Sequence, residues 1–163
     1  MKNSGFSLLE TMVALAILIG AIVGPLTLAS SSIKASSVAK NNLIAANLAQ
    51  EGIELVKNYR ANNVLKPGGS DWLAGLGSCF SGCEIDAITL DITPCGVSCN
   101  NPLKLEGSSG LYSYGVGANT IFTRKINIVD VVSGREVKIT STVLWSERFG
   151  QQQFELEAYM LNW

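Results

Sequence analysis

The chain begins with a short polar leader followed by the run Gly5-Phe6-Ser7-Leu8-Leu9-Glu10. Residues 11–33, the 23 that come next, carry no charge. With the four residues before Glu10, this run is long enough to cross a bilayer as a helix. Glu10 then stands at the start of a membrane segment, where a lone charge costs roughly 3 kcal/mol or more. We therefore expect a compensating positive charge, the α-amino group that forms if the chain is cut between Gly5 and Phe6.

This run resembles the processing site of type IV prepilins and pseudopilins. In that family a short basic leader ends in Gly, and a peptidase cuts after the Gly and methylates the new N-terminus. The new first residue is usually Phe, and the fifth residue of the mature chain is usually Glu. Lys2, Gly5, Phe6 and Glu10 stand at the matching positions. The resemblance implies cleavage after Gly5, methylation of Phe6, and pairing of Glu10 with the amine of Phe6 in its own or a neighbouring subunit.

The resemblance also implies a role, a location and partners. The role is that of a structural subunit of a type IV pilus-like filament. The precursor would cross the cytoplasmic membrane once, with its N-terminus in the cytoplasm and its head outside, before it joins the extracellular filament. The implied partners are a prepilin peptidase/methyltransferase, other pilin subunits bound through their N-terminal helices, and the inner-membrane assembly platform. Residues 142–163 loosely resemble minor pilins of the PilV type, which favours a minor pilin while major pilin and pseudopilin stay open.

Two other classes compete with this interpretation. In an ordinary secretory signal, Lys2 would be the basic end and Thr27-Leu28-Ala29 the cleavage site. That interpretation leaves Glu10 uncompensated, and the helical pattern continues past Ala29. In a membrane-anchored or secreted binding module, the head would be the active part, but a plain anchor gains nothing from Glu10.

Composition bounds the chemistry that is available. The chain has 163 residues, a net charge of -1 and 12 scattered Lys and Arg, so no basic run attracts nucleic acid. It has no histidine, which excludes Ser-His and Cys-His catalysis, histidine zinc sites and a histidine pH switch. We interpret the acidic pairs Asp86 and Asp91, and Glu155 and Glu157, as solvated strand and loop positions. The expectation is a protein with no catalytic residue, no metal and no cofactor, and not an enzyme.

The expected fold class is α+β, with a type IV pilin-like long N-terminal helix packed on a C-terminal antiparallel β-sheet head. We divide the chain into a leader (1–5), a transmembrane half of the helix (6–29), an amphipathic half (30–62) and a β-rich head with a disulfide loop (63–163). Within the transmembrane half, Gly24-Pro25 is expected to kink or loosen the helix, because proline removes a backbone donor. Gly20 and Gly24 form a small-xxx-small pair that permits close helix contact.

Beyond the membrane segment the hydrophobic pattern keeps a helical period. One stripe contains Ile33, Ile44, Leu48, Leu55 and Tyr59, and an adjacent stripe contains Val38, Ala45, Ala49 and Val56. The opposite side carries Lys40, Asn47, Gln50, Glu54 and Lys57. This pattern predicts an amphipathic helix whose apolar face covers the head. We expect it to end at about Asn62, at Asn62-Asn63 and Lys66-Pro67-Gly68-Gly69.

The head shows the period of two that is typical of strands. Residues 66–82 are predicted to form a packed loop, 84–86 and 88–92 two short extended stretches, and 102–105 with 111–114 a hairpin. Residues 121–132 form a long β-branched run that ends in a Ser133-Gly134 turn. The predicted inner face then contains Val137, Ile139, Val143, Trp145, Phe154, Leu156, Ala158 and Met160. One apolar face indicates a half-buried antiparallel sheet, which the amphipathic helix would cover.

Four cysteines form two C-x3-C pairs, Cys79 with Cys83 and Cys95 with Cys99. Outside the cytoplasm thiols oxidise, so we expect two disulfides. Three connectivities exist. The symmetric spacing slightly favours nested pairs, Cys79 with Cys99 and Cys83 with Cys95, whereas local pairs require each C-x3-C segment to turn. A zinc site made of four thiolates is the alternative. A redox catalyst is not indicated, because no C-x2-C motif opens a helix.

Overall fold

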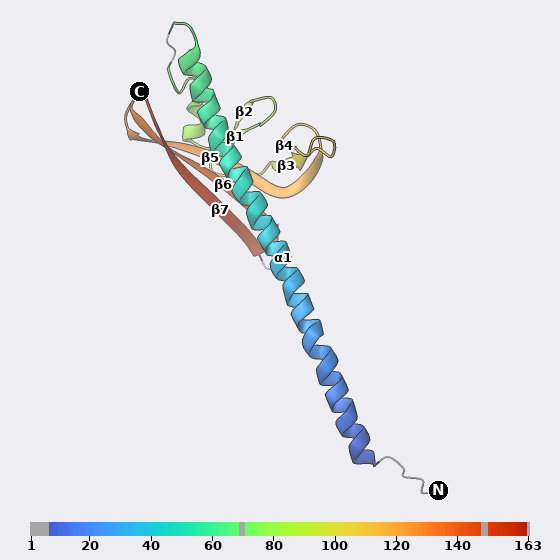
Figure 1. Cartoon of the computed structure of the whole chain (residues 1–163). Coiled ribbons are helices and arrows are strands. Elements are labelled where there is room, and N and C mark those ends of the chain that lie inside the picture. Colours follow the sequence, from blue (N-terminus) through green and yellow to red (C-terminus); the bar gives the residue numbers. More distant parts are fainter. Residues whose placement is uncertain (1–6, 69–70, 148–149, 163) are drawn as a thin grey trace. The chain divides into compact units, whose positions relative to one another are not determined.

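The computed structural model describes residues 7–68, 71–147 and 150–162. The chain divides into two compact units, Met1–Asn41 and Asn42–Trp163, and the helix α1 (Leu8–Leu65) runs through both. The described part also contains a short 3₁₀ helix, η1 (Gly77–Phe80), and seven strands (Figure 1). The strands are β1 (Cys83–Ile85), β2 (Ile92–Pro94), β3 (Pro102–Leu105), β4 (Tyr112–Ser113), β5 (Ala118–Val132), β6 (Glu136–Glu147) and β7 (Gly150–Leu161). The α+β prediction is confirmed: a long N-terminal helix packs on a C-terminal antiparallel sheet.

The strands form one antiparallel sheet with β5 at its centre. β5 pairs with β6 along one edge and with β1 and β3 along the other. β7 pairs with β6, while the short strands β2 and β4 flank β1 and β3. The predicted inner face of β6 is confirmed, since Val137, Ile139, Val143 and Trp145 are all buried. On β7 only Met160 is fully buried, and the other three predicted inward residues are half-buried.

Helix α1 ends three residues later than predicted. Asn63 does not stop the helix; it is buried, and its Nδ2 donates to the carbonyl oxygens of Trp72 at 3.3 Å and Ala74 at 2.7 Å. These bonds tie the loop after α1 back onto the helix. The side-chain amide therefore serves a tertiary contact, and the helix continues to Leu65, just before Lys66-Pro67.

The extended stretch predicted at residues 88–92 is wrong. These residues form a turn, Leu90 has a positive φ of 62°, and β2 begins only at Ile92. The cause is local: the Asp86 carboxylate accepts the backbone N–H groups of Ile88 and Thr89 and so closes an Asx-type turn. The predicted hairpin between residues 102–105 and 111–114 is confirmed as β3 and β4, although β4 contains only two residues.

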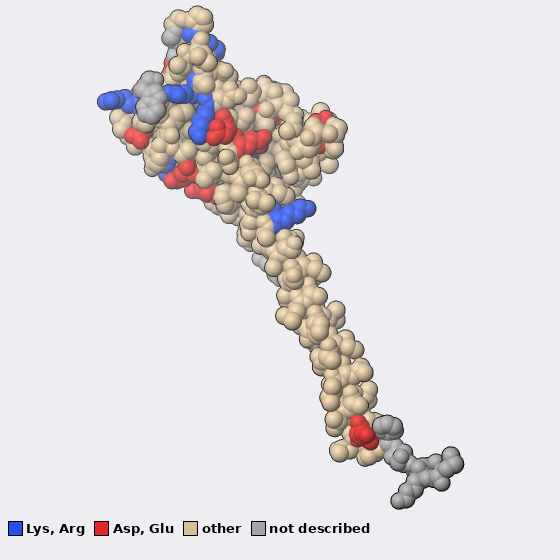
Figure 2. Space-filling model, viewed as in Figure 1, with Lys and Arg blue, Asp and Glu red and all other residues tan. Residues whose placement is uncertain are grey.

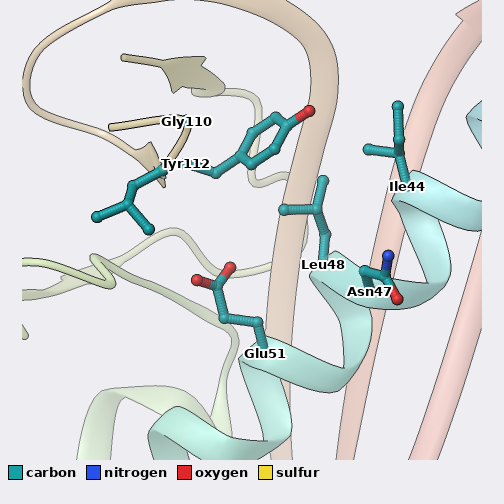
Figure 3. A pocket seen from close by; sticks show the side chains of 7 residues that line it. Ile44, Asn47, Leu48, Glu51, Gly110 and Tyr112 are labelled. Carbon is teal, nitrogen blue, oxygen red and sulfur yellow. The ribbon is translucent and has the colours of Figure 1, made fainter. Parts of the chain in front are cut away.

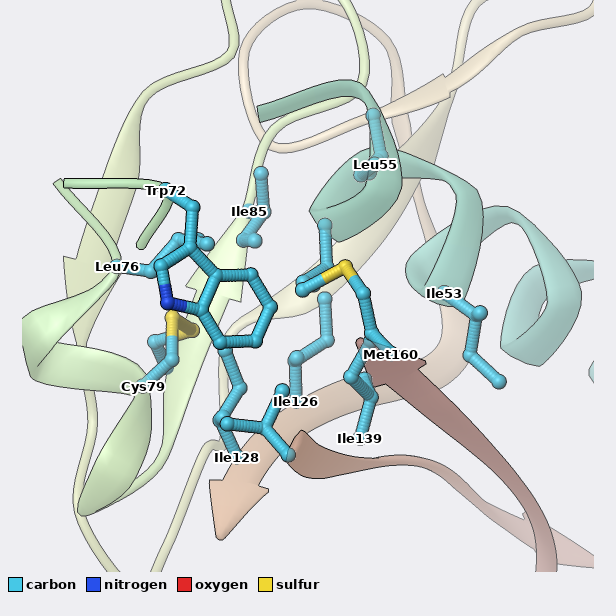
Figure 4. Packing of buried hydrophobic residues seen from close by; sticks show 13 residues of the cluster. Ile53, Leu55, Trp72, Leu76, Cys79, Ile85, Ile126, Ile128, Ile139 and Met160 are labelled. Atoms are coloured by element: carbon cyan, nitrogen blue, oxygen red, sulfur yellow. A yellow bond between two sulfur atoms is a disulfide. The ribbon is translucent and has the colours of Figure 1, made fainter. Parts of the chain in front are cut away.

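One part of the core lies between the C-terminal turns of α1, the loop after it, and the sheet. Trp72 and Leu76 from the loop are buried, which confirms the prediction of a packed loop. Figure 4 shows both side chains directed into the same cluster as strand residues of β5 and β6 and Met160 of β7. The helix contributes Ile53, Leu55 and Val56.

A second part of the core lies further toward the N-terminal side of the same helical segment. Ala45, Leu48 and Ala49 of α1 pack there on strand residues, namely Leu103, Phe122, Val143 and Trp145. The rings of Phe122 and Trp145 are 5.9 Å apart, centroid to centroid, and tilted by 49°. The predicted apolar stripes of this helical half are therefore buried from Ala45 to Val56, while Asn47, Gln50, Glu54 and Lys57 are exposed as predicted.

A polar layer separates these two clusters. On the inner face of β5, Arg124 lies between Phe122 of one cluster and Ile126 of the other, and its side chain is completely buried. Its Nη1 donates to Glu51 at 2.7 Å and to the carbonyl oxygen of Leu48 at 3.1 Å, and its Nη2 donates to the carbonyl oxygen of Ile85 at 2.9 Å. One guanidinium thus joins α1 to two strands. A buried charge is tolerated only when it is paired and hydrogen-bonded in this way.

Gly52 allows the helix to approach the sheet at this layer. A Cβ built on Gly52 would lie 2.5 Å from the Ser141 hydroxyl oxygen and 3.2 Å from Cδ of Arg124. The absence of a side chain at Gly52 therefore makes room for the Arg124 stem between α1 and β6.

We predict that Gly52→Ala destabilises the head by about 1–3 kcal/mol through overpacking. Helix propensity alone would give the opposite sign, since alanine is favoured over glycine by about 1 kcal/mol. The measurement is thermal or chemical unfolding of the detergent-solubilised full chain, followed by tryptophan fluorescence. Gln50→Ala, on the exposed side of α1, is the control and should change stability by less than about 0.5 kcal/mol. A Gly52→Ala protein as stable as the wild type would contradict the close approach.

We predict that Glu51→Gln destabilises the head by about 3 kcal/mol, because it leaves the Arg124 guanidinium buried without its counter-ion. The low end of the usual range applies, since the Glu51 side chain keeps 34% of its surface exposed. Arg124→Met should cost less, and the double variant should resemble Arg124→Met alone. Glu54→Gln removes only the surface pair with Lys57 and should cost less than about 1 kcal/mol. Equal losses for Glu51→Gln and Glu54→Gln would refute the role of the buried pair.

Candidate functional site

The predicted processing residues Gly5 and Phe6 lie outside the described residues. The first described residue is Ser7, and its carbonyl oxygen accepts the N–H groups of Glu10 at 3.0 Å and Thr11 at 3.2 Å. Glu10 therefore lies in the first turn of α1, and its side chain is exposed. An acid in this turn interacts favourably with the helix dipole, typically by about 0.3–1 kcal/mol when exposed. That contribution is much smaller than the cost of placing the carboxylate in a membrane, so the dipole alone does not explain Glu10.

The N-terminal part of α1 presents apolar side chains on all sides. Leu8, Leu9 and Leu28 expose 78%, 73% and 73% of their surfaces, and no residue of α1 before Ala45 is fully buried. Figure 2 shows this part of α1 almost free of charged side chains. Its length and composition are sufficient for it to cross a membrane. A helix that is apolar all round needs either lipid or other helices as its surroundings.

The proline of this segment lies inside the helix. α1 continues through Pro25, and the Thr27 hydroxyl donates to the carbonyl oxygen of Gly24 at 2.7 Å. The Ser31 hydroxyl donates in turn to the carbonyl oxygen of Thr27 at 2.9 Å. Both are bonds from a hydroxyl back to the preceding turn of the helix, and neither goes to the carbonyl of Ala21, the one that loses its backbone donor at Pro25. A kink at Gly24-Pro25 stays a prediction.

The four cysteines form two disulfides, Cys79–Cys83 and Cys95–Cys99. The slight preference for nested pairs is wrong. Both C-x3-C segments turn, which brings the Cα atoms of the paired cysteines to 4.6 Å and 4.9 Å, within the range that a disulfide bridges. Cys79 belongs to η1, and Gly82 precedes Cys83 with a positive φ of 110°, so the chain can reverse between Cys79 and Cys83.

The disulfides also decide the zinc alternative. The Glu84 carboxylate lies with the sulfur atoms of Cys95 and Cys99 in a group whose ligand atoms are within 4.8 Å of one another. The two sulfur atoms form a disulfide with each other, however, and a cysteine binds zinc only as a thiolate. In this redox state the group has no thiolate to offer a metal.

Glu84 instead anchors the chain that leaves the second disulfide. It is buried, and its carboxylate accepts the backbone N–H of Asn101 at 3.2 Å and the side-chain amide of Asn101 at 2.6 Å. On the other side of this loop, the carbonyl oxygen of Gly82 accepts the N–H groups of Cys95 at 3.0 Å and Gly96 at 3.1 Å. The loop of the second disulfide is therefore held at both of its ends.

The prediction that Asp86 is a solvated position is wrong. It is buried, and its carboxylate accepts three backbone N–H groups, from Ile88 at 2.8 Å, Thr89 at 2.9 Å and Tyr114 at 2.6 Å. Burial favours the neutral acid, but these hydrogen bonds outweigh it and hold the pKa of Asp86 below its usual 3.8. Asp86 thus joins the turn after β1 to the hairpin of β3 and β4. Asp91, Glu155 and Glu157 are exposed, as predicted.

Sequence reasoning missed the buried charges Glu84 and Arg124, and the half-buried Glu51 that pairs with Arg124. For Arg124 a signal was present: it shares the strand period of two with Phe122, Ile126 and Ile128, which places it on the inner face. Glu84, between the buried Cys83 and Ile85, carries no such signal, because all three residues of β1 are buried.

We predict that the stability of the head decreases on acidification between pH 3.8 and the lower folded pKa of Asp86. In this window the unfolded chain binds the proton and the folded chain does not, so stability is present above it and lost as pH falls. Asp86→Asn should lower stability by about 1.5–3 kcal/mol at neutral pH, since a charged acceptor is lost. The difference from wild type should shrink toward low pH, as measured by denaturant unfolding of the full chain at several pH values. Asp130→Asn, at an exposed position, is the control, and a difference that does not vary with pH would refute the assignment.

Three comparisons with known proteins bear on this chain. Residues 1–23 match the family model of the prokaryotic N-terminal methylation motif, and this match includes Gly5, Phe6 and Glu10. No curated protein matches the chain, and no solved structure matches it. The match ends at Val23, so it contains the start of α1 and none of the head. The chain therefore carries an N-terminal methylation motif of the type IV prepilin kind.

Proposed function

We propose that this chain is a structural subunit of a type IV pilus-like filament, a minor pilin or a pseudopilin. It is made as a membrane-anchored precursor, cut after Gly5 and N-methylated at Phe6, and then assembled through α1. The observation that supports this most directly is the methylation motif over residues 1–23, which contains the start of a helix of membrane-spanning length with exposed apolar side chains.

Glu10 and the new N-terminus form the proposed assembly pair. Cleavage after Gly5 gives Phe6 a cationic amine four residues before Glu10, at the start of the apolar helix. In the filament, Glu10 pairs with the amine of Phe6 in its own or a neighbouring subunit, which offsets the burial of both charges. A charge pair in an apolar surrounding also fixes the register of neighbouring helices, because a shift by one turn separates the two charges.

The parts of the chain take successive roles in this proposal. Residues 1–5 are the cytoplasmic leader, 6–29 cross the cytoplasmic membrane, 30–62 form the amphipathic half of the helix, and 63–163 form the head outside. On assembly, residues 6–29 exchange lipid for helix contacts, which Gly20 and Gly24 favour because they let backbones approach. The partners are a prepilin peptidase/methyltransferase, the inner-membrane assembly platform and other pilin subunits. The loose C-terminal likeness to PilV-type minor pilins supports the minor-pilin subtype.

We predict that intact-mass spectrometry of the full chain, co-expressed with a prepilin peptidase, shows loss of residues 1–5 and gain of one methyl group. The processed chain should also be recovered with filaments sheared from cells that carry a filament system. Gly5→Ala should leave the precursor uncut and absent from that fraction, because the peptidase is expected to cut after a residue without a side chain.

Other masses would identify other classes. A mature chain that begins near Ser30 would mean an ordinary secretory signal and would overturn the filament proposal. An uncut wild-type chain would instead point to a permanently anchored binding module.

A further inference from the structure

A small apolar groove lies between α1 and the β3–β4 hairpin. Its walls are Ile44 and Leu48 of the helix and Leu111 and Tyr112 of the hairpin, and Asn47, Glu51 and Gly110 complete it. Figure 3 shows Tyr112 across from Leu48, with the Glu51 carboxylate beside them. Its volume is about 280 Å³, just below the roughly 300–1,000 Å³ of small-molecule sites. A groove of this size suits one or two inserted side chains better than a cofactor.

Val97 is an apolar side chain that is held out into solvent. It exposes 90% of its surface, in the middle of the loop closed by the Cys95–Cys99 disulfide. The carbonyl oxygen of Val97 accepts a hydrogen bond from Lys125 at 3.4 Å, and Gly82 and Glu84 hold the two ends of the loop. A side chain on so constrained a loop loses little freedom when it enters a partner, which favours binding.

The groove and Val97 are associated with opposite faces of the sheet. Arg124 points to the α1 face, where it bonds Leu48 and Glu51, two residues of the groove. Lys125, the next residue of β5, points to the other face, because successive side chains of a strand alternate. Lys125 is the residue that bonds the Val97 loop. Val97 therefore does not belong to the face that forms the groove of the same chain.

The two surfaces also complement each other in charge. Lys125 lies beside Val97, and Glu51 lies beside the apolar walls of the groove. Glu51 binds Arg124 through one oxygen, but its side chain remains 34% exposed. A Lys125 that arrives with Val97 would add a second cation near this carboxylate, and such pairing fixes the orientation of partners.

We propose that the groove of one copy of this chain receives Val97 of a second copy, with Lys125 of the incoming copy near Glu51. The contact is heterologous, because a patch of one copy meets a different patch of the next. A heterologous contact that does not close into a ring propagates as an open helical array. This inference rests on the proposed filament function and gives it a partner. The partner is a second copy of the same chain, and the contact is made between the globular heads of the two copies.

The test is filament assembly of the full-length Val97→Asp variant. We expect its recovery in sheared filaments to fall by about tenfold, while cleavage, methylation and both disulfides remain as in the wild type. Val116→Asp is the matched control, since Val116 is also a loop valine and is 74% exposed. Recovery of Val97→Asp at the wild-type level, or an equal loss for Val116→Asp, would overturn the inference.

Cross-linking identifies the occupant of the groove. A benzoylphenylalanine placed at Ser98, beside an intact Val97, should give a covalent dimer of this chain in filaments, with the cross-link in residues 44–51 or 110–112. A dimer cross-linked elsewhere, a product with another protein, or no product in assembled filaments would overturn the inference and leave the proposed function standing. A wild-type chain that is never cut or never enters filaments would instead contradict the proposed function itself.

Discussion

The buried guanidinium of Arg124 is the constraint around which the head is built. A cation with no exposed surface needs acceptors inside the protein, and the two Nη groups of Arg124 find them on α1 and β1 at once. Its stem also requires small neighbours, and Gly52 and Ser141 provide them. The apolar core consequently consists of two clusters with a polar layer between them. Such a layer adds little net stability but penalises any sliding of the helix along the sheet, since a shift would leave the charge unpaired.

The loops of the head depend on a second kind of constraint, which is short in range. Two disulfides each close a five-residue segment, and two buried carboxylates bind backbone N–H groups around them. Glu84 and Asp86 flank Ile85, so the short strand β1 and the residue directly after it organise both the turn that follows and the chain beyond the second disulfide. This explains how a segment rich in glycine and serine is ordered enough to present a side chain such as Val97 in a defined place.

Helix α1 has two kinds of surface, one amphipathic and one apolar on all sides. From Asn42 onward, one side of it is buried by the sheet and the other is polar, as in a soluble protein. Before that point its apolar side chains are exposed. Among the described residues of this segment, 7–41, Glu10 is the only acid. The methylation motif, which ends at residue 23, lies within the second kind of surface and does not reach the first. The function is therefore argued from the N-terminus, and the architecture of the head is consistent with it.

Patterns that repeat over a few residues were readable from the chain alone. These include the processing motif with Glu10, the apolar run, the amphipathic helix and the alternating strands, because spacing and period are local properties. The tertiary structure decided what depends on partners: local disulfides in place of nested ones, a turn at residues 88–92, a helix that continues past Asn63, and the pairing of Arg124 with Glu51, 73 residues away. Period shows which face is buried, but it does not show which group a buried charge, amide or thiol meets, because that depends on how the folded chain places the two groups, whether the partner is four residues away, as for Cys79 and Cys83, or 73 residues away, as for Arg124 and Glu51.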